Sequence, residues 1–261
     1  MRRREFITLL GSAAAAWPRT ASAQQPNRMR RIGVLIAVPE TDAEEQEWVA
    51  AFVEALTKFG WTRGVNINFE YRWSAGDNVL TQTYAAELAS LKPDVIFAQG
   101  TPVTVALKSA TRSIPIAFVN VTDPVSSGLV ASLAQPGANI TGFTNCEYSM
   151  GGKWLELLKD IASSVRRIAV ILNPDSIATR PLFNSIESAV KTFNFEVMKV
   201  AVHDAGEIER EIGKRSAEKN IGLMALPDLI PLANRELIIA LAMHYGMPTF
   251  FHSEYLLLRA H

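Results

Sequence analysis

The chain has 261 residues, of which 48% are hydrophobic and 20% charged, with 26 Lys+Arg against 26 Asp+Glu. This composition is ordinary for a globular protein and excludes a collagen, a coiled coil and a disordered chain. A net charge of +0 argues against a nucleic-acid-binding protein, which would carry a basic excess. The single cysteine, Cys146, excludes a disulfide framework and a cysteine-based zinc site. The length favours two domains over one.

Residues 1–23 have the pattern of an export signal. Arg2, Arg3 and Arg4 precede the apolar run Leu9–Trp17, and a small-x-small cleavage site ends at Ala23. The arginines also fit the twin-arginine pattern of proteins that are exported in the folded state. No cysteine follows the apolar run, so we expect a soluble periplasmic protein that is cleaved near Ala23 and not lipid-anchored. An N-terminal amphipathic helix is the alternative interpretation.

The first half of the remaining chain alternates strands with helices. Ile32–Ile36 is a short apolar run, the pattern of a strand that is buried on both faces. Thr41-Asp42 offers an N-cap for a helix that ends at Gly60, a second helical stripe covers Tyr84–Leu91, and a third helix begins at Gly100. Further strands are predicted over Asn66–Arg72, Val95–Ala98, Pro115–Val119 and Ile140–Phe143.

The second half repeats this order of elements, in pattern and not in residue identity. Strands are predicted over Arg167–Leu172, Glu196–Val202, Leu223–Leu226 and Pro248–Phe251, which is the last one. Helices are predicted over Ser185–Phe193, Glu207–Lys219 and Arg235–Tyr245.

Strand–helix alternation in both halves predicts an α/β fold of two Rossmann-like lobes, each with a parallel sheet covered by helices on both faces. We expect the first lobe over residues 24–145 and the second over residues 146–261. Right-handed crossovers place the loops after the strands at one edge of each sheet. Two such edges that face each other leave a cleft, which is where ligands of open α/β sheets bind.

Polar residues follow the predicted strands at the edges of this cleft. Gly100-Thr101-Pro102 has two interpretations. The glycine lets the backbone approach a ligand closely, and the helix that starts here can hold a carboxylate at its N-terminus. Alternatively, the three residues are an ordinary helix cap. Asp123 and Asp228 either pair with a ligand amino group or cap the segment that follows. Asn173 is a turn residue or a ligand hydrogen-bond partner. The candidate ligand-binding residues are Glu40, Gly100, Thr101, Thr122, Asp123, Tyr148, Asn173 and Asp228.

Other conspicuous residues have simpler interpretations. Tyr148 lies at the crossing between the lobes, where hinge packing is the alternative to ligand contact. Acidic residues gather at the start of the first helix, where they complement the helix dipole rather than form a metal site. They are Glu40, Asp42, Glu44, Glu45 and Glu47. Cys146 is interpreted as inert and semi-buried, and Trp48 and Trp61 as core or helix-end packing.

No sequence motif of known chemistry is present. The chain lacks the phosphate-binding G-x-x-x-x-G-K-[ST], the dinucleotide-binding G-x-G-x-x-G after the first strand and the hydrolase G-x-S-x-G. Its histidines show neither metal-ligand spacing nor an acidic partner close in sequence at a strand end. We therefore expect a binding protein rather than an enzyme, with no catalytic residue, metal or cofactor.

Several passages resemble the substrate-binding proteins of bacterial ABC uptake transporters, in the branch that includes tryptophan-binding members. The more specific ones are Val121-Thr122-Asp123-Pro124 and the run Gly151–Leu158. The others are Met1–Gln25, Arg31–Trp61, Asp94–Phe143 and Ala225–Tyr245. The resemblance implies a type I periplasmic-binding-protein fold that closes on a small solute and delivers it to a permease in the inner membrane. It also implies ligand contacts from Thr101, Thr122, Asp123, Asn173 and Asp228.

The end of the chain departs from this family. Ser253–His261 does not resemble the expected continuation, so we expect a C-terminally truncated second lobe that lacks the segment returning to the first. The predicted function is that of a monomeric solute-binding component of an ABC transporter, which binds an amino-acid-like or aromatic ligand by lobe closure and has no nucleic-acid partner. The alternatives are an exported α/β enzyme that uses Asp123 or Asp228 as acid–base and a ligand-sensing receptor module.

Overall fold

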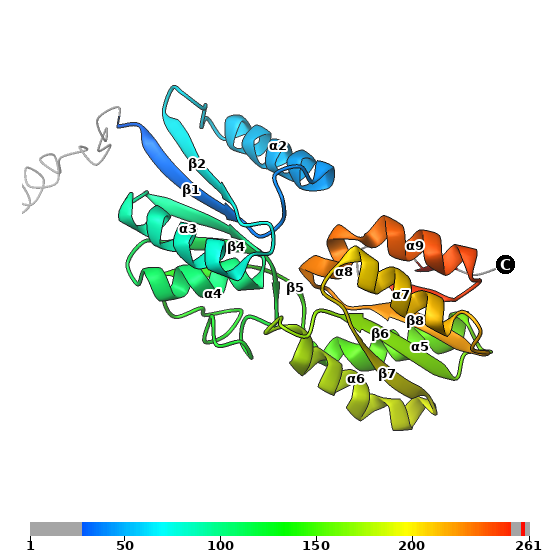
Figure 1. Cartoon of the computed structure of the whole chain (residues 1–261). Coiled ribbons are helices and arrows are strands. Elements are labelled where there is room, and N and C mark those ends of the chain that lie inside the picture. The colour runs from blue at the N-terminus through cyan, green and yellow to red at the C-terminus, as the bar shows by residue number, and fades with distance from the viewer. Residues whose placement is uncertain (1–27, 252–256, 259–261) are drawn as a thin grey trace, which may run out of the picture.

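The computed structural model describes residues 28–251 and 257–258, so the predicted signal peptide lies outside the described residues. In the first lobe, defined here as β1 to β5, five strands form one parallel sheet (Figure 1). The strands are β1 (Arg30–Ile36), β2 (Ile67–Trp73), β3 (Val95–Gln99), β4 (Ile116–Thr122) and β5 (Ile140–Cys146). The helices between them are α2 (Ala43–Lys58), α3 (Asn78–Ser90) and α4 (Thr101–Ala110).

The second lobe, defined as η1 to β10, contains the other sheet. Its strands are β6 (Arg167–Leu172), β7 (Glu196–Ala201), β8 (Ile221–Ala225), β9 (Thr249–Phe251) and β10 (Leu257–Leu258). Its helices are the 3-10 turn η1 (Tyr148–Met150), α5 (Gly151–Ile161), α6 (Thr179–Phe193), α7 (Ala205–Arg215), α8 (Leu229–Ala233) and α9 (Arg235–His244).

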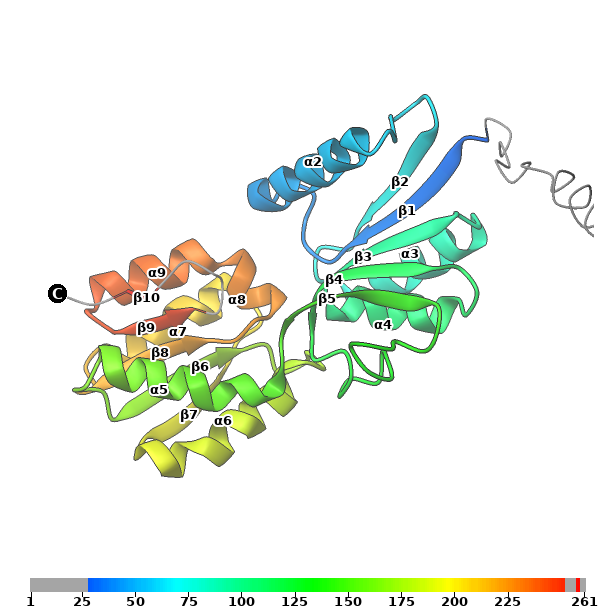
Figure 2. The same cartoon turned by 180° about the vertical axis from the view of Figure 1, so that it is seen from behind.

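The two sheets share one topology. The first has the strand order β2-β1-β3-β4-β5, which Figure 2 shows from top to bottom, and the second has the corresponding order β7-β6-β8-β9-β10. This confirms the predicted α/β fold of two Rossmann-like lobes. The lobe boundary between residues 145 and 146 stays a prediction.

One strand was not expected, because Pro248–Phe251 was predicted to be the last. β10 follows β9 and pairs with it in the antiparallel direction, with Leu257 opposite Phe250. Five residues separate the two strands. A parallel connection needs a crossover of a dozen or more residues, so a connection of this length allows only antiparallel pairing.

Each sheet is covered on both faces by helices, as the apolar strands predicted. In the first lobe, α3 and α4 pack on one face against Ile96 and Phe118, and α2 lies over the other against Val34. In the second lobe, α5 and α6 cover one face and α7 and α9 the other. The central strands β1, β6 and β8 are almost wholly buried, which explains their continuous apolar runs.

Two helices begin earlier than predicted because an acidic side chain caps them. Asp77 accepts hydrogen bonds from the N–H groups of Val79 and Leu80, so α3 starts at Asn78 rather than near Tyr84. Asp204 likewise caps α7. Such capping satisfies first-turn N–H groups that have no partner within the helix. Over the described part of the chain, no helix combines the length and apolarity that crossing a bilayer requires.

Candidate functional site

A cavity of about 640 Å³ lies between the two lobes. Its first-lobe wall comes from the start of α2, the ends of β3, β4 and β5, and the start of α4. Its second-lobe wall comes from the loop after β6, the segment from the end of β8 into α8, and the end of β9. The volume falls in the range typical of small-molecule sites. The cleft predicted at the strand ends is therefore present as a cavity that both lobes line.

The first-lobe rim is a chain of hydrogen bonds across three strand ends. The buried hydroxyl of Thr101 accepts from the Thr122 N–H at 3.0 Å. The Thr122 hydroxyl donates to Asn145 Oδ1 at 3.1 Å, and Asn145 Nδ2 donates to Asn120 Oδ1 at 2.8 Å. Gly100 is the N-cap of α4 and has φ 98°, a conformation that favours glycine. The predicted Gly100, Thr101 and Thr122 all line the cavity, together with the unpredicted Asn120 and Asn145.

The Asp123 carboxylate is engaged in local structure. Oδ1 accepts from the Ser126 N–H at 2.9 Å, and Oδ2 accepts from the Tyr148 N–H at 3.2 Å. Asp123 therefore makes the capping contact that was one of its two predicted roles, and it also ties the first lobe to the crossing segment. The Tyr148 side chain packs against the core of the second lobe, and burial raises its pKa. The described residues that form the cavity wall do not include Asp123, Tyr148, Glu40 or Asn173, whose part in binding stays a prediction.

Asp228 organises the second-lobe rim. Its carboxylate caps α8 by accepting from the Ile230 N–H at 3.2 Å, and it also hydrogen-bonds the side chains of Ser176 and Asn173. Burial raises the pKa of Asp228, and these hydrogen bonds oppose the rise. Asp228 and Ser176 line the cavity, and Asn173 hydrogen-bonds Asp228 without being part of the wall. The pairing joins the loops after β6 and β8.

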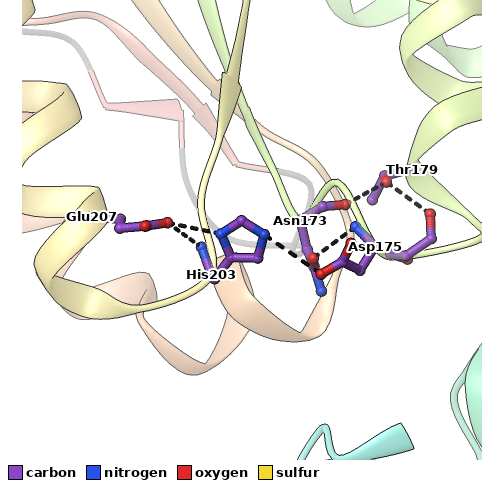
Figure 3. A network of polar contacts seen from close by, with 6 residues as sticks. Asn173, Asp175, Thr179, His203 and Glu207 are labelled. Atoms are coloured by element: carbon purple, nitrogen blue, oxygen red, sulfur yellow. Dashed lines mark hydrogen bonds and ion pairs between the residues drawn. The ribbon is translucent and has the colours of Figure 1, made fainter.

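A second polar network lies beside this rim (Figure 3). His203 follows β7, and its ring lies 2.9 Å from Glu207 Oε2 and 3.5 Å from Asp175 Oδ2. Asp175 in turn donates its N–H to Asn173 Oδ1 at 3.0 Å. The hydrogen bond with Glu207 raises the pKa of His203 and lowers that of Glu207. The network links the loops after β6 and β7. The expectation that no histidine at a strand end has an acidic partner close in sequence is therefore wrong for His203.

This network makes a pH-dependent contribution to stability. A histidine whose pKa is raised by folding stabilises the protein fully below its unfolded pKa, and the contribution is lost as pH rises through the folded value. We expect ¹H–¹⁵N NMR titration to give His203 a pKa above its ordinary value, returning toward it in Glu207→Gln. Glu209→Gln, on the same helix, is the control and should leave the titration unchanged. An ordinary pKa in the native chain would contradict the network.

Two residues of the cavity wall differ from their predicted roles. Trp48 was interpreted as packing, but 47% of it is exposed and it lines the cavity. Glu45 was interpreted as one of several acids that complement the helix dipole, but it is 4% exposed and also lines the cavity. Burial raises the pKa of Glu45 to about 7, and the charges of Asp42 and Glu44 add to the rise. Gln99 Nε2 donates a hydrogen bond to Glu45 Oε2 at 3.0 Å.

Aromatic side chains form the apolar part of the wall. The rings of Phe52 and Phe97 are stacked with centroids 4.6 Å apart, and both residues line the cavity with Trp48. Phe143 on β5 is 79% exposed and completes this side. Sequence reasoning missed these residues because an apolar helix stripe and apolar strands are ordinarily core. Trp48 lies on a helix whose only buried residue is Glu45, and the sequence pattern does not reveal this.

An ion pair joins the lobes beside the cavity. Arg235 at the start of α9 lies 3.1 Å from Glu44 Oε2 and 3.8 Å from Asp42 Oδ2, both at the start of α2. All three side chains are partly buried. Leu229 of α8 adds an apolar contact by packing against the first-lobe core. The relative position of the lobes therefore rests partly on one ionic contact.

Replacing Arg235 should loosen this contact. We expect Arg235→Gln to increase the radius of gyration in small-angle scattering, with a cost of roughly 0.2–1 kcal/mol in the free energy of unfolding. Lys58→Gln is the matched control, because Lys58 pairs with Glu54 at 2.7 Å within α2 and does not reach the second lobe. Equal radii of gyration in Arg235→Gln and the native chain would contradict a bridging role.

Two other features bear on chemistry. Cys146 is buried, and burial raises the pKa of its thiol to about 12, which leaves it protonated and unreactive at neutral pH. Within residues 28–251, no group of three or more His, Cys, Asp or Glu side chains is placed to hold a metal ion. The cavity thus offers hydrogen-bonding groups, carboxylates and aromatic faces.

Comparison with known proteins agrees with this geometry. The model of the family "ABC transporter substrate binding protein" matches residues 31–259. A tyrosine-binding protein of Clostridioides difficile (strain R20291) is 30% identical over 229 residues, which are 84% of this chain and 65% of that protein. The chain therefore spans slightly less than two thirds of that relative.

Solved structures show the same fold. A conserved domain protein from Vibrio cholerae O1 biovar El Tor is 25% identical with a TM-score of 0.77, covering 87% of this chain and 75% of its own. An ABC domain from Streptococcus pneumoniae was solved in complex with L-Trp. It has a TM-score of 0.73 at 19% identity, and the match covers 85% of this chain and 74% of that domain. At that identity the second likeness concerns the fold alone.

Proposed function

Because the chain belongs to the family of ABC transporter substrate-binding proteins, we propose that it is the solute-binding component of an ABC uptake transporter. In this proposal it holds a small, amino-acid-like or aromatic ligand between its lobes and presents it to a permease in the inner membrane. The family is one of solute-binding proteins rather than enzymes. The observation that carries the proposal is that strand ends from both lobes line the same cavity.

The chemistry of the wall supports the ligand class. Trp48, Phe52 and Phe97 offer faces for a flat apolar group. Opposite charges of a small zwitterion can be met by the start of α4 at Gly100, where N–H groups and the helix dipole favour a carboxylate, and by the carboxylates of the wall. The relative from Clostridioides difficile is a tyrosine-binding protein, and tyrosine belongs to this ligand class.

The short connection between the lobes supports binding by lobe closure. Strand β5 ends at Cys146, and Glu147 leads directly into η1. A short connection of this kind allows hinge motion, and a ligand that contacts both lobes shifts the population toward the closed form. Thr101 and Thr122 on one side and Asp228 on the other are the predicted contacts that would close on the ligand.

Localisation is part of the proposal. The twin-arginine pattern, the apolar run and the Ala23 cleavage site support export to the periplasm as a soluble protein without a lipid anchor. These residues lie outside the described part of the chain, so the support comes from sequence. Edman sequencing of the protein recovered from the periplasm should begin at Gln24, and recovery from the cytoplasm alone with Met1 retained would contradict export.

A thermal-shift and calorimetric screen tests the binding function. Probes are the twenty amino acids with benzoate, and the protein is the full chain. A ligand at 100 times its Kd should add about 2.7 kcal/mol to the free energy of unfolding. We expect stabilisation by at least one aromatic or amino-acid probe, and none by glucose or inorganic phosphate. If neither the amino acids nor benzoate stabilise the protein, the proposed ligand class is overturned.

A further inference from the structure

The charge of the cavity wall is one-sided. Among the described residues that line it, carboxylates are present at Glu44, Glu45 and Asp228, and no lysine, arginine or histidine is. Glu44 is paired with Arg235, and the Asp228 carboxylate accepts hydrogen bonds from its own loop and from Ser176 and Asn173. Glu45 is the remaining carboxylate, and no ion pair holds it within the described structure.

The surroundings of Glu45 fix its position without neutralising it. Its N–H donates to Asp42 Oδ1 at 2.9 Å, which holds the backbone at the start of α2. The buried Gln99 accepts from the Ala37 N–H at 3.3 Å through Oε1, so its Nε2 is directed to Glu45 Oε2 at 3.0 Å. One carboxylate oxygen is thus hydrogen-bonded, and Oε1 has no hydrogen-bond partner among the described residues. Because Glu45 lines the cavity, a ligand group that is cationic or donates hydrogen bonds can reach this carboxylate.

The aromatic wall is compatible with such a partner. Trp48 is three residues after Glu45 on α2, so both side chains lie on the same side of the helix, and both line the cavity. Aromatic faces attract cations as well as flat apolar groups. A ligand with a cationic head beside an apolar body would therefore satisfy Glu45 and Trp48 together.

We propose that the ligand carries a protonated amino group and that Glu45 binds this group, so that the cavity selects amines and amino acids over aromatic acids that have only a carboxylate. The inference deepens the proposed function and rests on it. Glu45 is then the specificity-determining residue of the site. Its free oxygen accepts from the ammonium, while Gln99 holds the other oxygen in place.

Matched probes separate the charge of the ligand from its shape. L-tryptophan, tryptamine and indole-3-propionate share a ring and differ in carrying both charges, the amine alone or the carboxylate alone. L-tyrosine, tyramine and 3-(4-hydroxyphenyl)propionate form a second trio. Calorimetric titration of the full chain should show amine-bearing probes binding about 10- to 100-fold more tightly than the carboxylate-only probe of the same trio.

Two variants assign the preference to Glu45. Glu45→Gln should weaken the amine-bearing probes by about tenfold or more while leaving the carboxylate-only probes unchanged or tighter. Glu47→Gln, which removes the same charge from an exposed position of α2, should leave all affinities within about twofold. Thermal unfolding of each variant establishes that it is folded before titration.

The pH dependence gives a second readout. The charged groups around Glu45 are Asp42 and Glu44 on α2, Arg235 on α9 and Asp228 across the cavity. Because the pKa of Glu45 is raised to about 7, its carboxylate form grows between pH 6 and pH 8. The affinity for tryptamine should rise over this interval in the native chain and stay flat in Glu45→Gln, which separates Glu45 from Asp228.

The outcomes distinguish the inference from the function on which it rests. Tighter binding of the carboxylate-only probes, or equal amine affinities in Glu45→Gln and the native chain, would overturn the role of Glu45 and leave the binding function standing. Failure of every probe in both trios would overturn the proposed aromatic ligand class and the inference with it.

Discussion

The Glu45→Gln variant is expected to be more stable than the native chain at pH 8 without ligand, by as much as about 3 kcal/mol. Burial raises the pKa of Glu45 from 4.5 to about 7. Between these values the folded state holds a proton that the unfolded state has released, so the free energy of unfolding falls as pH rises. A glutamine keeps the hydrogen bond from Gln99 and has no charge to desolvate.

Urea unfolding of both proteins from pH 4 to pH 8 measures this difference. The two free energies of unfolding should converge near pH 4, where Glu45 is protonated in both states, and diverge up to pH 8. Glu47→Gln is the control, because its side chain is exposed and should give a nearly pH-independent difference. A Glu45→Gln protein that is less stable than the native chain at pH 8 would show that the carboxylate is not penalised by burial.

Gly142→Ala is expected to destabilise the first lobe by about 3 kcal/mol or more, because a Cβ there meets backbone. The added carbon would lie 2.0 Å from the Phe118 carbonyl oxygen, and Gly142 pairs with Phe118 across β4 and β5. The pairing becomes irregular immediately after this point, between Phe118 and Val121. The close approach positions Thr122 and Asn145 at the ends of the two strands.

The matched control for this variant is Gly128→Ala. Gly128 has φ 69° and no heavy atom within 4 Å of an added Cβ, so it tests backbone strain without a clash. We expect that variant to lose only about 1 kcal/mol. Urea unfolding gives both free energies. A Gly142→Ala loss that is no larger than that of Gly128→Ala would contradict the close approach of β5 to β4.

The fold could be predicted because local sequence patterns determine the strands and helices of each lobe. The apolar runs at Ile32–Ile36 and Arg167–Leu172 became the central strands β1 and β6, and the alternation of strand and helix determined a parallel sheet in each lobe. The rule that ligands bind at the carboxyl ends of parallel strands then found Gly100, Thr101, Thr122 and Asp228 on the cavity wall.

The remainder of the site depends on packing between segments that are distant in the chain. Glu45 is not distinguishable from Glu44 and Glu47 by sequence, since only the approach of Gln99 and the second lobe buries it. Trp48 has the pattern of a core residue and faces the cavity instead. Asp123 follows a strand as Asp228 does, but its φ of 41° and its bonds to Ser126 and Tyr148 direct it to the hinge.

These features fit a site in which local stability is sacrificed for recognition. A buried carboxylate that lacks a cation, together with exposed aromatic side chains at Trp48 and Phe143, raises the free energy of the unliganded form. A ligand that covers the rings and meets the carboxylate recovers that free energy on binding. Buried carboxylates and exposed aromatic side chains both depart from the residue pattern of a stable fold, and such departures are expected at functional sites.

We propose that both lobes contact one solute in the same cavity. Calorimetric titration with L-tryptophan and L-tyrosine tests this proposal, using Trp48→Ala in the first lobe and Leu232→Ala in the second, since both residues line the cavity. We expect one site per chain and an affinity that falls about tenfold or more in each variant separately. Binding that is insensitive to either variant would place the solute on one lobe and contradict a site shared by both.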